Sequence, residues 1–72
     1  MVKIIDEHQT DNWRLLMLDK EFLLKEQGQT VKINGKRFNV FSVHGIKKAI
    51  AIKMPKGFNV SFIGLTVEDT GG

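Results

Sequence analysis

The basic side chains of this sequence are concentrated in one part of it. Residues 28–67 carry seven lysines and arginines and no carboxylate, whereas residues 1–27 carry four basic and six acidic side chains. Cations bind phosphates and carboxylates, so this asymmetry predicts an anionic partner, either nucleic acid or an acidic protein surface. Two simpler explanations stay open: the lysines protect sheet edges from aggregation, or the acidic N-terminal segment neutralises the basic part internally.

One pair of cations has a spacing that suggests a shared anion. Asn34-Gly35 predicts a two-residue hairpin turn, which places Lys32 directly opposite Arg37. Like charges in opposed positions are unfavourable, and a bound anion would remove the penalty; alternatively, the two side chains splay apart in water. The candidate contact set comprises the seven cations and one phenylalanine: Lys32, Lys36, Arg37, Lys47, Lys48, Lys53, Lys56 and Phe58.

The segment 53–58 combines two lysines with Met54 and Phe58. A basic turn beside an aromatic ring resembles the way in which single-strand binders grip a phosphate backbone and stack on a base. Met and Phe are equally typical anchors in a protein groove. A third interpretation, and the simplest, places both side chains in the core beside a solvated turn.

The residues that could catalyse a reaction do not form a recognisable set. Ser42 and His44 lie close together in sequence, but no acid that could orient the histidine lies within residues 28–67 around them. The donors at residues 6–11 match no metal-binding spacing, and no glycine-rich phosphate loop is present. The sequence therefore predicts a non-enzymatic module with no metal and no cofactor.

The length and composition predict a single small domain. A chain of 72 residues buries only about 60% of its unfolded surface, so its core is marginal. Without cysteine, stability must come from apolar packing or from a homo-oligomer. Apolar runs such as Leu15–Leu18 are too short to cross a bilayer, and no leader pattern is evident, so we expect a cytoplasmic protein that does not bind membranes. The domain is expected over 1–69, with a frayed tail at 70–72.

Turn signals divide most of the chain into strands. The expected strands are 2–5, 30–33, 36–43, 46–54 and 58–67. Residues 12–27 are ambiguous, because their composition suits a helix whereas their apolar positions spread around the whole helical wheel. Two short strands at 13–18 and 21–25, with a loop at 7–12 before them, fit slightly better.

The expected pairing makes the central strand apolar on both faces. A two-residue turn at His44-Gly45 places Val40 opposite Ala49 and Phe38 opposite Ala51, so a bulge or a bend between two packed sheets is required. The sequence therefore predicts an all-β domain: a five- to six-stranded antiparallel barrel or sandwich, SH3-like or OB-like in shape. The alternative is an α+β domain with a helix at 12–27 on a three- to four-stranded antiparallel sheet.

Three functions fit these features. The first is binding of nucleic acid, mainly through phosphate contacts that weaken with salt. The alternative is a small adaptor or inhibitor that docks its basic face on an acidic protein surface, with Trp13, Met54 or Phe58 as anchors. The third is a homo-oligomer joined through the extra apolar strand face. The exposure of the aromatic side chains discriminates among them, because a solvated apolar patch beside lysines favours a protein partner.

Overall fold

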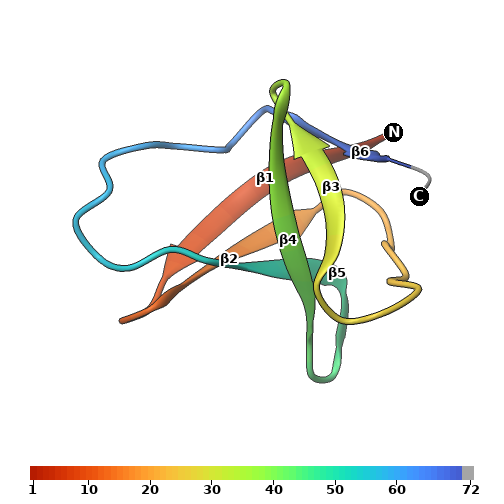
Figure 1. Cartoon of the computed structure of the whole chain (residues 1–72), viewed down its shortest axis with the longest axis horizontal. Helices are drawn as coiled ribbons and strands as arrows, with labels where there is room; N and C mark the ends of the chain where they lie inside the picture. Colours follow the sequence, from red (N-terminus) through yellow and green to blue (C-terminus); the bar gives the residue numbers. More distant parts are fainter. Residues whose placement is uncertain (71–72) are drawn as a thin grey trace.

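The computed structural model describes residues 1–70 and is built from six β-strands (Figure 1). The strands are β1 (Val2–Gln9), β2 (Trp13–Leu18), β3 (Gln29–Ile33), β4 (Lys36–Val43), β5 (Ile46–Lys53) and β6 (Thr66–Asp69). Among residues 1–70 no helix forms, so the all-β prediction is confirmed and the alternative helix at 12–27 is wrong. Residues 13–18 form a strand because apolar side chains on both of its sides become buried or partly buried when the strand is part of the barrel wall.

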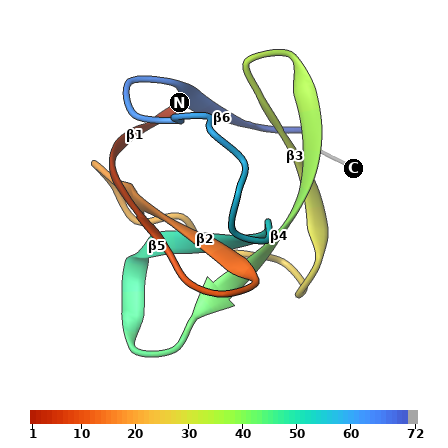
Figure 2. The same cartoon turned by 90° about the vertical axis from the view of Figure 1, so that its left-hand side faces the viewer.

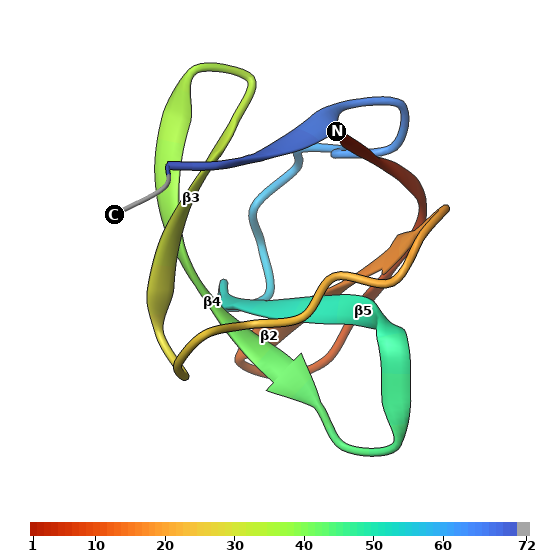
Figure 3. The ribbon, with the colours of Figure 1, turned by 90° about the vertical axis from the view of Figure 1, so that its right-hand side faces the viewer.

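The six strands close into one antiparallel barrel in the order β1-β2-β5-β4-β3-β6. Strands β3, β4 and β5 follow one another as hairpins, and β6 returns to lie beside β3, which is a Greek-key arrangement. Two long connections make this order possible. Residues 54–65 pass across one opening of the barrel (Figure 2), and residues 19–28 run from β2 past β5 to β3 (Figure 3).

The hairpin between β3 and β4 has the turn that the sequence predicts. Asn34 and Gly35 both adopt positive φ angles, of 53° and 80°, as a type I′ turn requires. The register follows, and Lys32 pairs with Arg37. Since core residues flank Lys32 on β3, its side chain points to the outside of the barrel.

The predicted register of the β4–β5 hairpin is correct at its first pair and wrong beyond it. Val43 pairs with Ile46 as expected, but a bulge between Ser42 and Val43 shifts the rest, so that Val40 pairs with Ile52. The shift places the large side chain of Ile52 inside the barrel and leaves small Ala51 on the outside. The bulge also explains how one strand can be apolar on both faces.

The barrel interior is filled by aliphatic side chains from all six strands and by one phenylalanine from the connection 54–65. The core residues are Ile4, Leu16, Leu18, Val31, Ile33, Val40, Ile50, Ile52, Phe62 and Val67. Arg14 is the charged residue buried with them, at 5% exposure. A buried charge requires partners, and these come from the end of β1 and from the connection 54–65, two segments whose structure was predicted incorrectly.

Three expected segments differ from the structure. Strand β1 continues through the expected loop to Gln9, because Glu7 and Gln9 point inward and bind Arg14. Residues 21–25 are irregular, and the expected strand 58–67 is wrong over 58–65, because the observed strand covers Thr66–Asp69. The backbone of residues 58–62 is held by side chains of the barrel and not by a neighbouring strand.

Two further features concern the expected tail and the membrane. Thr70 donates a hydrogen bond of 3.0 Å from its hydroxyl to the carbonyl oxygen of Thr30. The rest of the expected tail, residues 71–72, lies outside the described residues. Within residues 1–70 the structure contains no helix that is long and apolar enough to cross a membrane.

Candidate nucleic-acid interface

The seven candidate cations occupy three places on the barrel. Lys32, Lys36 and Arg37 belong to the β3–β4 hairpin, whereas Lys47 and Lys48 belong to the β4–β5 hairpin. These two hairpin turns lie at opposite ends of β4 (Figure 1), whose eight residues span roughly 23 Å at the usual strand rise. The remaining two, Lys53 and Lys56, lie at the end of β5 and in the connection that follows it.

Two of the exposed cations point outward from neighbouring strands. Arg37 alternates along β4 with Phe38 and Val40, which pack on or in the core, so Arg37 and Asn39 face the solvent. Continuing the β4–β5 register by one residue beyond Val40 and Ile52 places Lys53 beside Asn39. The structure therefore brings Arg37 and Lys53 to the same outer side, separated by an exposed amide.

The acidic C-terminal residues offset part of the basic charge. Strand β6 pairs with β3 and places Glu68 opposite Lys32, on the side away from Arg37. This carboxylate explains how the like-charged pair is tolerated without a bound anion. Glu68 therefore offsets the charge of Lys32 more directly than that of Arg37.

Lys56 and Phe58 sit on the connection 54–65, away from the strand surface. The Lys56 ammonium lies 2.8 Å from the Asp11 carboxylate in a highly exposed ion pair, which contributes little to stability. Phe58 is 56% exposed, so the interpretation that places it in the core is wrong. Met54, in contrast, packs against the core as that interpretation expects.

Two aromatic rings meet on the outside of the barrel, beside the outward-facing cations. Trp13 on β2 and Phe41 on β4 stand edge to face, with ring centroids 5.3 Å apart and an interplanar angle of 85°. Strand β5 runs between them, and Ala51 pairs with Phe41 on one side and with Leu15 on the other. The rings meet across a whole strand because the intervening side chain is a methyl group.

Lys53 is directly opposite Trp13 in the β2–β5 ladder. A cation, an aromatic pair and an amide therefore lie together on one side of the barrel. We refer to the outward-pointing residues Trp13, Arg37, Asn39, Phe41 and Lys53 as the aromatic–basic face. This face combines cations for phosphate, rings for stacking and a polar side chain for base edges.

The buried guanidinium of Arg14 fixes the connection 54–65 from inside the barrel. It lies 2.7 Å from the carboxylate of Glu7 and donates a hydrogen bond to the amide oxygen of Gln9. It also donates to the carbonyl oxygens of Phe58 and Val60. The guanidinium also lies over the ring of Phe62, 5.7 Å from its centroid. An irregular segment is thereby positioned by charged hydrogen bonds, which are among the stronger ones in proteins.

Glu7 completes this buried network. Its second carboxylate oxygen accepts a hydrogen bond of 2.7 Å from the backbone N–H of Phe62 and another from the hydroxyl of Ser61. Phe62 enters the core and meets Phe38 edge to face, with centroids 5.6 Å apart. The network thus holds Phe62 inside the barrel while its neighbours on the connection remain outside.

Three apolar side chains of this connection face the solvent. Phe58, Val60 and Ile63 are 56%, 50% and 51% exposed. No carboxylate lies within residues 54–65, and Lys56 is the one cation there. Three exposed apolar side chains within six residues, on a segment with fixed backbone, favour a protein-binding surface.

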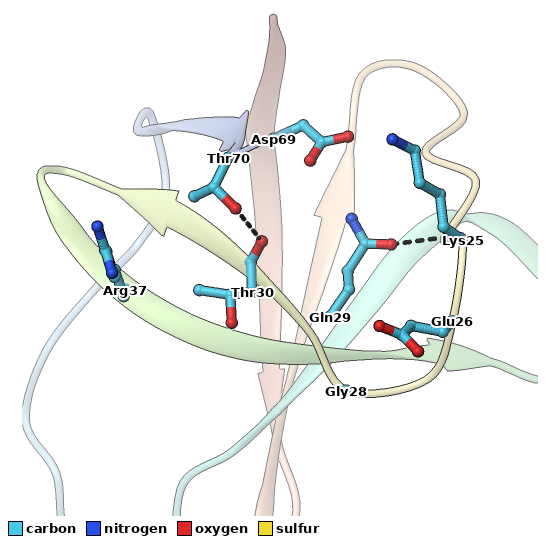
Figure 4. A pocket seen from close by; sticks show the side chains of 8 residues that line it. All are labelled: Lys25, Glu26, Gly28, Gln29, Thr30, Arg37, Asp69 and Thr70. Atoms are coloured by element: carbon cyan, nitrogen blue, oxygen red, sulfur yellow. Dashed lines mark hydrogen bonds between the residues drawn. The ribbon is translucent and has the colours of Figure 1, made fainter. Parts of the chain in front are cut away.

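A shallow hollow of about 520 Å³ lies beside β3, between the segment 25–28 and the end of β6 (Figure 4). Its lining includes Lys25 and Arg37 but also Glu26 and Asp69. The amide of Gln29 accepts a hydrogen bond from the backbone N–H of Lys25 at its edge. Because its charges are mixed, this hollow does not select an anion. Arg37 belongs to both the hollow and the aromatic–basic face, and Glu26 and Asp69 offset part of its charge, whereas Lys53 and the two rings of the face lie outside the hollow.

The residues considered for catalysis and metal binding do not converge. In strand β1 Asp6 and His8 point outward while Glu7 points inward. Ser42 is held by the side chain of Gln27. Within the part of the chain that the structure describes, no group of three or more acidic or histidine side chains could hold a metal ion.

Two parts of the site were not expected from the sequence. The Trp13–Phe41 contact depends on the bulge that sets Ala51 between the two rings, and this bulge has no local signal. Arg14 did carry a signal, since it alternates in phase with Leu16 and Leu18 on an otherwise apolar strand side. No family model, curated protein or solved structure matches this chain.

Proposed function

We propose that this domain is a non-enzymatic binding module that engages nucleic acid through its aromatic–basic face. The observation that carries the proposal is the placement of Arg37 and Lys53 on the same outer side as the Trp13–Phe41 pair. Phosphate contacts from lysine and arginine supply most of the affinity in such complexes. Lys32, which pairs with Arg37 and points outward like it, extends the cationic edge. Lys36 pairs with the buried Ile33 and lies on the other side of the strand. The expected cytoplasmic location would give the domain access to RNA.

The proposal predicts binding that weakens steeply with salt. Each neutralised phosphate of a single strand contributes about −0.7 to the slope of log K against log salt, so three contacts give a slope of about −2. Anisotropy of a fluorescein-labelled oligonucleotide, titrated with the protein between 50 and 200 mM salt, measures this slope. Absence of binding at the lowest salt concentration would exclude the proposal.

A second function is favoured by one observation, the exposure of Phe58, Val60 and Ile63. In this alternative the connection 54–65 docks on another protein, and Lys56 meets an acidic rim around the contact. Because Arg14 and Glu7 already fix the backbone, little conformational entropy is lost on binding.

The protein-binding alternative predicts a nuclease-resistant complex that depends on Phe58. The tagged domain, chemically cross-linked in its own cell extract and treated with nuclease, would retain a protein that the Phe58→Ser variant loses. The matched control is Leu23→Ser, which removes an exposed apolar side chain from the segment 19–28. Equal retention by all three proteins would exclude the alternative.

A further inference from the structure

The aromatic–basic face has a feature that separates single-stranded from duplex nucleic acid. Its two rings belong to β2 and β4 and are only partly buried, and they stand on the convex outside of a closed barrel. In a duplex the flat faces of the bases are stacked inside the helix, where a ring on a convex wall cannot reach them. Reading of the major groove uses an inserted helix or a two-stranded ribbon, whereas this face lies on the barrel wall.

The position of the aromatic pair is fixed by its surroundings. The ring of Phe41 lies over Ala51 and against Gly28, where an added Cβ would meet two ring atoms at 3.5 Å. Gly28 has a φ of 83°, so the chain turns there without a side chain that would compete for this space. A base that approaches the pair therefore meets rings that are already in place, and little ordering is required.

Polar groups lie next to the aromatic pair, on the same outer side of the barrel. On β4, Asn39 precedes Phe41 by two residues, and Arg37 precedes Asn39 by two residues. Lys53 lies across from Trp13 and, by extension of the β4–β5 register, beside Asn39. Stacking rings, an amide for base edges and two cations for phosphates are thus arranged along about 13 Å of strand, which is the rise of four residues.

We propose that the domain binds single-stranded nucleic acid in preference to duplex, with a base stacked on the Trp13–Phe41 pair and the adjoining phosphates on Lys53 and Arg37. This inference rests on the proposed function, and it adds the strandedness of the ligand and the residues that recognise it. Stacking tolerates any base, because every base has a π-face, so discrimination among sequences is weak.

Trp13 is the one tryptophan of the chain, so its fluorescence reports directly on this face. The probes are an oligothymidylate of about 12 nucleotides, a length within the range for one small barrel, and a duplex of the same length. We expect the single strand to quench Trp13 and to bind at least about tenfold more tightly than the duplex, as loss of one stacking contact implies.

Two variants test whether the rings are responsible. Phe41→Leu keeps an apolar side chain over Ala51 but removes the π-face, and thermal unfolding followed by circular dichroism verifies that it folds. We expect this variant to lose about tenfold in affinity for oligothymidylate while its affinity for the duplex is unchanged. Phe58→Leu is the matched control, because it removes an exposed ring from the connection 54–65, and its binding is expected to be unchanged.

The outcomes separate this inference from the proposed function. Equal, salt-dependent binding of single strand and duplex, with no change in Trp13 fluorescence, would overturn the single-strand inference and leave the phosphate-binding proposal standing. A loss of affinity in Phe58→Leu but not in Phe41→Leu would also overturn it, because stacking would then take place on the connection. Absence of binding to both probes would overturn the two together.

Discussion

The Arg14→Met variant is expected to be destabilised by about 3–5 kcal/mol, since removal of one partner from a buried ion pair leaves the other without compensation. Glu7 would lose its cation, and the carbonyl oxygens of Phe58 and Val60 would lose their donor. The whole domain is expected to have a stability of about 4–11 kcal/mol at typical values per residue, so much of it would be lost. Urea denaturation followed by circular dichroism measures the difference.

Two controls show whether the buried position of this pair is responsible. Lys56→Met removes a cation from the exposed pair with Asp11, and we expect it to change the free energy of unfolding by less than about 1 kcal/mol. The double variant Arg14→Met with Glu7→Leu removes both charges and is expected to be less destabilised than the sum of its single variants. An Arg14→Met variant as stable as Lys56→Met would contradict the role given to Arg14.

Reversal of two charges on the aromatic–basic face is expected to weaken nucleic-acid binding by about 100-fold or more, because each charged hydrogen bond to phosphate is worth about 1.5 kcal/mol or more. The variant is Arg37→Glu with Lys53→Glu, at two exposed positions where the fold tolerates any polar side chain. Its salt slope is also expected to fall, from about −2 toward −0.7, as two phosphate contacts are removed. Anisotropy with labelled oligothymidylate measures both quantities.

The β4–β5 hairpin supplies a control of identical charge change. Lys47→Glu with Lys48→Glu alters the net charge equally, but these lysines lie at the start of β5, next to the end of β4 that is remote from Arg37. We expect the control to lose only a little affinity for oligothymidylate, because it changes the long-range electrostatic attraction of the whole protein but no direct phosphate contact. An equal loss in both variants would show that net charge, and not the aromatic–basic face, determines binding.

The local features of this fold could be predicted from the sequence, whereas the long-range features could not. Asn34-Gly35 specified its turn type and therefore the pairing of Lys32 with Arg37, because two-residue hairpin loops fix the register. The alternating side chains of Trp13–Leu18 were compatible with a strand. The bulge between Ser42 and Val43 shifts every pair of that hairpin that lies farther from the turn. It brings Val40 to the same inner side as Ile50 and Ile52, and the need to fill the barrel with these side chains depends on the whole closed sheet.

The last third of the chain was the hardest part to predict. Its apolar residues suggested a strand over 58–67, but the alternation of apolar and polar residues does not show whether a segment pairs with a neighbouring strand. Here the carbonyl oxygens of Phe58 and Val60 bind the side chain of Arg14, and the N–H of Phe62 binds Glu7, more than 40 residues away in sequence. The same contacts leave Phe58 exposed and place Phe62 in the core, so only the folded structure distinguishes the two rings.

The most direct test of the account is to map the binding surface by backbone and Trp13 indole NMR shifts during titration with oligothymidylate. We predict that the shifts concentrate on the aromatic–basic face, at Trp13, Arg37, Asn39, Phe41 and Lys53, while residues 46–48 and 58–63 stay largely unaffected. Shifts that concentrate on residues 58–63, or no shifts at low salt, would contradict the claim that this face binds nucleic acid.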